Sequence, residues 1–405
     1  MLDRLQSGCF TIISGKTKVT QAAVARRRRG NWRKDMAKKR IGYFDIAKCI
    51  AILFIIIGHT GLIFNETLPG GMPSKIVHLA FTFHLPVFFI ASGYFFKLDT
   101  VLNKQFFKKA WKNIVTPYWV TCIFIIVGCV MVAALLGTSM KNELIRWTGA
   151  SLYGSGVASH KMLLPVERIG GIWFLLALLW AQVIILTASR LPKPALWIAG
   201  LFVVGWAASY SIQLPWSIQS GICAAPFVYA GAMARKHQII EKDGLIPNIA
   251  TAACAVIWLI YICATNADMS FADFYLPSGI GDLIGSFAAA YVVFRACRFV
   301  EHHWAGLSKF MEWIGRNTLV IFCFHIVEDN AMNPVWQKLI ALCSNMFPSF
   351  GWVVFLIVRI LFIALECAII YVVPKINAIY FPSKRKRPAP AAAAAKPNSV
   401  PKGNR

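Results

Sequence analysis

The sequence predicts an all-α membrane protein, a polytopic helix bundle with about ten transmembrane helices. Hydrophobic residues make up 58% of the 405 residues and charged residues only 15%, a balance too apolar for a soluble chain of this length. Ten apolar runs are long enough to cross a bilayer. Lys and Arg concentrate in every second linker between these runs, as in cytosolic membrane loops.

The predicted crossings follow one another along most of the chain. They start near residues 43, 76, 114, 171, 196, 217, 248, 275, 317 and 351. The basic linkers alternate with linkers that are poorer in positive charge, so the positive-inside rule places both termini in the cytosol. We therefore expect an integral protein of the cytoplasmic (inner) membrane of a bacterium.

The two ends of the chain differ from the apolar centre. Residues 1–40 carry a run of four arginines and lack the apolar core of a secretory signal, which predicts a basic cytosolic extension. Residues 382–405 combine basic residues with Pro and Ala repeats, a composition that predicts a disordered tail near anionic lipid. Residues 41–381 are expected to form one transmembrane domain. The net charge of +25 resides mainly in these ends and in the linkers, so we expect membrane lipid and no nucleic acid as a partner.

Three ionisable residues lie in the first crossing, where such groups are costly and indicate function. Lys48 and His59 are eleven positions apart, which on a helix is about 16 Å of rise and roughly 20° of rotation. Both side chains therefore lie on one face. Asp45 precedes Lys48 by three positions and is expected to pair with it.

The second crossing places His84 at a depth similar to that of His59. Two histidines on sequential antiparallel helices can meet, and an imidazole can accept a hydroxyl proton near neutral pH. A single membrane histidine can also simply bond a neighbouring helix, and Lys48 can snorkel to the surface. We prefer the packing reading for His84 alone and a functional reading for the aligned Lys48 and His59.

Later crossings carry further ionisable residues. In the ninth, His325, Glu328 and Asp329 can orient a substrate or bind one another. In the tenth, Arg359 and Glu366 are seven positions apart on one face and are predicted to be structural partners, to each other or to nearby polar groups.

A metal site is not expected. Asp282, in the eighth crossing, can line the same cavity as the histidines or be an interfacial carboxylate. A metal set could be drawn from His59, His84 and Asp282, but no local ligand spacing supports it. The eleven cysteines lack CxxC spacing, so we interpret them as reduced core residues.

Four segments together resemble the acyltransferase-three family of membrane acyltransferases, particularly its fucose 4-O-acetylase-like branch. They are a basic residue followed after ten positions by histidine (Lys48 to His59), FHLPVFFIASGYFF at 83–96, GIWFLLALLW at 171–180, and WIGRNTLVIFCFHIVE at 313–328. The resemblance implies an enzyme that moves an acyl group, usually acetyl, from cytosolic acyl-coenzyme A to a hydroxyl of a sugar or another acceptor.

The resemblance also implies roles for particular residues. His59 would be the catalytic histidine, and Lys48 would handle the donor with a point charge where the family often has a bidentate arginine. Acetyl-coenzyme A is then a co-substrate, and no bound cofactor is expected. Candidates for stabilising the oxyanion are His84, Trp173 and backbone groups near Ser92, which is also the nearest alternative nucleophile.

Two other classes of function, a transporter and a noncatalytic scaffold, are the alternatives. A transporter of a lipid-linked saccharide or organic anion would use the same buried charges as a path, although no repeated halves are visible. A noncatalytic scaffold would leave Lys48 and His59 unexplained. The long linker 138–170 is the expected lid over the acceptor.

Overall fold

The computed structural model describes residues 41–265 and 269–372. These residues form helices, with two isolated β-bridges and no strands, so the predicted all-α class is confirmed. The predicted extension 1–40 and tail 382–405 lie outside the described residues.

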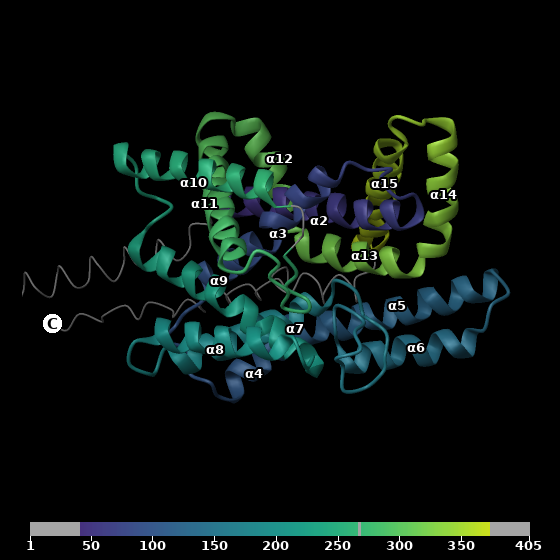
Figure 1. The fold of residues 1–405 in the computed structure, drawn as a ribbon, viewed down its shortest axis with the longest axis horizontal. Helices are drawn as coiled ribbons and strands as arrows, with labels where there is room; N and C mark the ends of the chain where they lie inside the picture. Colours follow the sequence, from purple (N-terminus) through teal and green to yellow (C-terminus); the bar gives the residue numbers. More distant parts are fainter. Residues whose placement is uncertain (1–40, 266–268, 373–405) are drawn as a thin grey trace, which may run out of the picture.

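Two antiparallel helices run through the centre of the bundle (Figure 1). They are α2 (Gly42–Thr67) and α3 (Ser74–Phe95). Helix α9 (Ile218–His237) packs very closely against α3. A Cβ atom on Gly93 would lie 1.8 Å from the Val228 carbonyl oxygen, and one on Gly231 would lie 2.1 Å from that of Ile90. Glycines at these crossings let the two backbones touch, as is common between membrane helices.

The segment between α3 and α9 begins with α4 (Lys104–Ala110) and a π-helical turn (Trp111–Val115), which lead into α5. Helix α5 and the following α6 lie side by side along the lower edge of Figure 1. Two short apolar helices, α7 and α8, then bring the chain back to the centre. Their bounds are Thr116–Leu135 for α5, Met140–Tyr153 for α6, Trp173–Ala188 for α7 and Pro194–Ser209 for α8.

The last third of the chain forms two helical pairs joined by a bent element. Helices α10 (Leu245–Ala264) and α11 (Ile280–His303) pack against each other. Helix α12 (Ala305–Arg316) then meets α13 (Thr318–Ala331) at a bend of 60°. Finally, α14 and α15 form the hairpin at the right of Figure 1. Their bounds are Asn333–Met346 and Gly351–Val372.

The predicted crossings coincide with helices, but their number differs from the number of clear spans. By length and apolar character, six helical stretches of the described residues can cross a membrane, or seven if α12 and α13 form one bent span. Helices α7 and α8 have only 16 residues each, fewer than the roughly 20 that a straight span needs. The count of ten crossings therefore stays a prediction.

The buried side chains form two hydrophobic clusters. The larger one surrounds the first part of α2 together with α3, α7, α9 and α11. The smaller one lies where the last part of α2 meets α14 and α15. The boundary between them is the part of α2 that carries His59, so polar groups there are held between two packed regions.

Candidate active site

The polar stripe of α2 begins with an ion pair. The Nζ atom of Lys48 lies 2.6 Å from Oδ1 of Asp45, and their side chains are 25% and 4% exposed. The helical spacing of three predicted this pairing, which the structure shows. Lys48 keeps enough exposure to meet a solute, while the buried carboxylate fixes its position.

His59 lies three turns further along α2, beside helix α13. Its Nδ1 atom is 3.4 Å from Oδ2 of Asp329, and the two side chains are 19% and 15% exposed. The ring of His325 packs next to it, with centroids 5.1 Å apart. A Cβ on Gly171 would lie 3.4 Å from Cε1 of His59, so the Gly170-Gly171 turn before α7 borders the imidazole. One nitrogen of His59 therefore faces a carboxylate.

A buried arginine joins the carboxylates of α13 to α2. Arg359 of α15 is fully buried and donates hydrogen bonds to Glu328, with Nε 3.2 Å from Oε1. It also donates from Nη2 to Oδ1 of Asp329 at 2.7 Å and from Nη1 to Oγ1 of Thr60 at 3.2 Å. The second oxygen of Glu328 accepts a hydrogen bond from Nε1 of Trp336 at 2.6 Å. We call Arg359, Glu328 and Asp329 the buried charge network.

His325 belongs to the support behind His59. It is fully buried, and its Nδ1 lies 2.9 Å from Oε1 of Glu328. Its Nε2 has no hydrogen-bond partner among the described residues. His325 lines none of the three cavities described below, so it touches His59 and the network instead of a solute.

Two cavities lie along the stripe of α2 and share part of their lining. The Lys48 cavity, of about 260 Å³, is lined by Lys48, Ser92 and mainly apolar side chains. The His59 cavity, of about 280 Å³, is lined by His59, His84 and Trp173. Both are bordered by the same three side chains, Ile55, Leu85 and Phe322.

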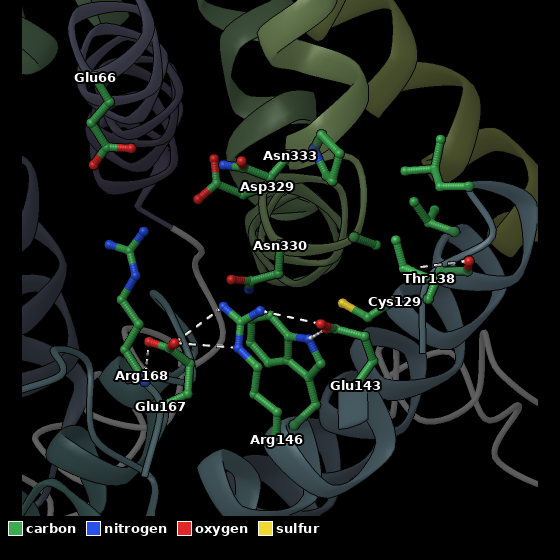
Figure 2. Close-up of a pocket in the computed structure, with 16 residues that line it drawn as sticks. Glu66, Cys129, Thr138, Glu143, Arg146, Glu167, Arg168, Asp329, Asn330 and Asn333 are labelled. Atoms are coloured by element: carbon green, nitrogen blue, oxygen red, sulfur yellow. Dashed lines mark hydrogen bonds and ion pairs between the residues drawn. The ribbon is translucent and has the colours of Figure 1, made fainter. Parts of the chain in front are cut away.

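A third cavity opens beside His59. The Arg146 cavity, of about 430 Å³, lies between α5, α6 and the junction of α13 with α14 (Figure 2). It shares four lining residues with the His59 cavity: Glu66, Arg168, Asp329 and Asn330. His59 itself does not line the Arg146 cavity, which reaches the His59 cavity through these shared residues.

The structure brings most of the residues singled out in the sequence to these cavities. His84 and Trp173 both line the His59 cavity. The Nδ1 atom of His84 lies 2.5 Å from the Ala80 carbonyl oxygen, which leaves Nε2 for other partners. Ser92 lines the Lys48 cavity and not the His59 cavity. The catalytic roles of these residues stay predictions.

Asp282 lies near the start of α11, away from the three cavities. Its carboxylate accepts hydrogen bonds from the Tyr261 hydroxyl at 2.6 Å and from the Ser278 backbone N–H at 2.8 Å. It lines none of the three cavities. Its contacts satisfy the backbone at the start of α11 and fasten α10 to it, so the structure gives Asp282 a fold-stabilising position.

The partner of Arg359 is on α13 and not on its own helix. Its guanidinium bonds Glu328, Asp329 and Thr60, whereas Oε2 of Glu366 has no hydrogen-bond partner in the part of the chain that the structure describes. Sequence reasoning did not assign Asp329 to His59. The spacing of His325 with its two following carboxylates places all three on one helical face, a signal that could have suggested a shared site.

One cluster has the donor atoms for a metal ion. His59, His325 and Asp329 each offer an atom within 4.8 Å of the others. This set differs from the one drawn from the sequence, because His84 and Asp282 are not in it. The Arg359 guanidinium already places positive charge against Asp329, so the carboxylate is neutralised without a metal.

Fold and site together define a helical membrane protein with a histidine–carboxylate pair beside cavities that share lining residues. Comparison with known families then identifies the family of the chain. The acyltransferase-3 family model, described as an acyltransferase domain, matches residues 41–371. The chain therefore belongs to this family, and membrane acyltransferase activity in general follows from membership. No curated protein and no solved structure matches the chain.

Proposed function

We propose that this protein is a membrane O-acyltransferase that moves an acyl group, in the simplest case acetyl, from cytosolic acyl-coenzyme A to a saccharide hydroxyl on the opposite side. One observation carries the proposal. The Lys48 cavity and the His59 cavity border on the same three side chains, which supports a path from a basic residue at one end of α2 to a histidine three turns away.

The donor fits the first half of this path. Basic residues cluster at the Lys48 end, in the segment 97–112 that follows α3 and in the segment 295–316 that includes the end of α11 and α12, which supports a cytosolic orientation. Lys48 would meet a donor phosphate as a point charge. The pantetheine arm would extend through the mainly apolar cavity, and the roughly 16 Å rise between Lys48 and His59 matches the reach of such an arm.

The chemistry falls to His59 and Asp329. The carboxylate beside Nδ1 holds the ring in the tautomer whose Nε2 can take a proton. His59 would remove the acceptor hydroxyl proton while the oxygen attacks the thioester carbonyl. The new C–O bond forms, the C–S bond breaks, and the proton passes to the departing thiolate. Trp173, which lines the His59 cavity, would donate a hydrogen bond to the oxyanion from its indole N–H. His84 donates from Nδ1 to the Ala80 carbonyl oxygen, so its neutral ring would present Nε2 to the cavity as an acceptor.

The acceptor approaches from the other end. The Gly-rich linker 138–170 contributes Arg146 and Arg168 to the cavity next to His59, which supports its expected role beside the acceptor. Because the sequence resembles fucose 4-O-acetylase-like proteins, fucosides belong in any acceptor panel. The transporter reading is not favoured, since it gives no reason for a carboxylate-held histidine at the end of a donor path.

The test is acetyl-coenzyme A turnover by purified full-length protein with a panel of glycan acceptors. We expect His59→Ala to lower kcat about 10²- to 10⁴-fold and Lys48→Ala mainly to raise the donor KM. His303→Ala is a matched control because His303 is exposed on α11 and should leave both constants unchanged. Equal turnover by wild type and His59→Ala would contradict the proposal.

A further inference from the structure

The Arg146 cavity has an unusual charge for this protein. The chain carries 42 Lys and Arg against 17 Asp and Glu. Yet four carboxylates and two guanidinium groups line this cavity, and the buried Arg359 offsets the charge of Asp329, so the lining keeps an excess of one carboxylate. The carboxylates belong to Glu66, Glu143, Glu167 and Asp329. A cleft lined by an excess of one charge concentrates solutes of the opposite sign and repels those of the same sign.

Arg146, one of the two arginines that line the cavity, already pairs with carboxylates of the protein. The Arg146 guanidinium lies 3.1 Å from Oε2 of Glu167 and 3.3 Å from Oε1 of Glu143. It also stands over the Trp147 ring, 5.2 Å from its centroid. Figure 2 shows these contacts forming one wall of the cavity. An anion would have to compete with two carboxylates for this guanidinium, so Arg146 acts as part of the wall.

The second arginine faces an acid across the passage to His59. Arg168 and Glu66 both line the Arg146 cavity and the His59 cavity, and in Figure 2 the Arg168 side chain points toward Glu66. Asp329 borders the same passage and is held by the buried Arg359. A negatively charged solute that moves toward His59 must therefore pass the carboxylates of Glu66 and Asp329, while the Arg168 guanidinium lines the same passage.

The remaining polar groups suit uncharged hydroxyls. Asn330, Asn333 and Thr138 line the cavity. Asn330 Nδ2 and the Thr138 hydroxyl already donate to backbone carbonyls, and Asn333 Oδ1 accepts from Gln337. The Asn330 and Thr138 oxygens therefore remain as acceptors and the Asn333 Nδ2 as a donor. Amides and hydroxyls both donate and accept hydrogen bonds, as sugar hydroxyls do. The volume of about 430 Å³ is within the range of roughly 300 to 1,000 Å³ that small-molecule sites occupy.

We propose that the Arg146 cavity binds the saccharide acceptor and selects neutral sugars or amino sugars over uronates and phosphorylated sugars. The selection arises because the lining carboxylates repel a negative substituent and attract an ammonium group. This inference rests on the proposed function, since the selected hydroxyl is the one presented to His59. It adds the position of the acceptor and the charge that this position accepts.

The test is equilibrium binding to the full-length protein in nanodiscs, without donor. The probes are methyl glycosides that differ only in charge: glucoside, glucosaminide and glucuronide, with the corresponding galactose set. We expect the neutral and amino glycosides to bind about 10-fold or more tightly than the uronides, a difference that one nearby carboxylate can produce. Glu66→Lys exchanges the sign of an exposed lining residue and should narrow or reverse this ranking.

A matched control makes the same charge change elsewhere. Asp99 is exposed in the linker after α3, at the Lys48 end, so Asp99→Lys should leave the ranking as in wild type. The proposal is overturned if uronides bind as tightly as neutral glycosides, if Glu66→Lys leaves the ranking unchanged, or if no glycoside binds.

Failure of this inference can be told apart from failure of the proposed function. If acetyl-coenzyme A turnover depends on His59 but glycosides of different charge bind equally tightly, only the charge selection is wrong. A clear charge ranking in a protein with no His59-dependent turnover would retain the saccharide site and remove the acyltransferase mechanism.

Discussion

The two ends of α2 hold their charges in different ways. At the Lys48 end, one half-exposed lysine pairs with one carboxylate on the same helix, and the adjoining cavity is mainly apolar. At the His59 end, a fully buried arginine from α15 bonds two carboxylates of α13 and a threonine of α2. A pair within one helix can adjust to a solute, whereas a network across three helices fixes geometry. This difference fits the proposed roles of the two ends, donor binding at Lys48 and reaction at His59.

The largest expected effect comes from removing the arginine of the buried charge network. Arg359→Met leaves Glu328 and Asp329 buried without their cation, which typically costs about 3–5 kcal/mol. We expect a large fall in Tm of the purified protein. Arg298→Met is the contrasting control, because Arg298 pairs with the exposed Asp243 at the Lys48 end, and exposed pairs contribute little. A wild-type Tm for Arg359→Met would show that the network is not a structural element.

A somewhat smaller effect is expected from neutralising the partner of His59. Asp329→Asn keeps the shape of the side chain and removes the charge that orients and stabilises the imidazole. We expect kcat to fall about 10²-fold with little change in the donor KM. Asp282→Asn neutralises a buried carboxylate away from the cavities, so the folded fraction of this control should keep its kcat. An unchanged kcat in Asp329→Asn would remove Asp329 from the mechanism.

The smallest effect concerns the linker that follows α9. The Arg298 guanidinium, 2.6 Å away, lowers the pKa of the exposed Asp243 carboxyl. A carboxyl with a lowered pKa in the folded state stabilises that state above its unfolded pKa, and this stabilisation is lost as the pH falls through the folded pKa. Asp243→Asn should therefore lower Tm slightly at neutral pH, and the difference from wild type should shrink on acidification. A difference that grows at low pH would contradict this assignment.

The sequence predicted what depends on local spacing. The apolar runs became helices, and the three-residue spacing of Asp45 and Lys48 became an ion pair. The eleven-residue spacing placed Lys48 and His59 along adjoining cavities. Each of these follows from the periodicity of one helix.

What the sequence did not predict depends on how distant helices meet. Arg359 bonds carboxylates about thirty positions earlier in the chain, and α6 supplies a cavity wall to a site centred on α2. No spacing rule within one helix reveals such contacts. The predicted count of ten crossings stays a prediction, because short helices and a 60° bend between α12 and α13 break the simple relation between an apolar run and a span.

The proposed donor path from Lys48 to His59 requires that the two cavities along α2 connect. Leu85 is half-buried and lines both of them, so Leu85→Trp should fill the connection, while Leu85→Met keeps its volume. The decisive measurement is acetyl transfer from acetyl-coenzyme A to a glycoside, made alongside donor binding. We predict that Leu85→Trp binds donor but transfers little acetyl, and that Leu85→Met behaves as wild type. Wild-type transfer by a folded Leu85→Trp protein would contradict the path from Lys48 to His59.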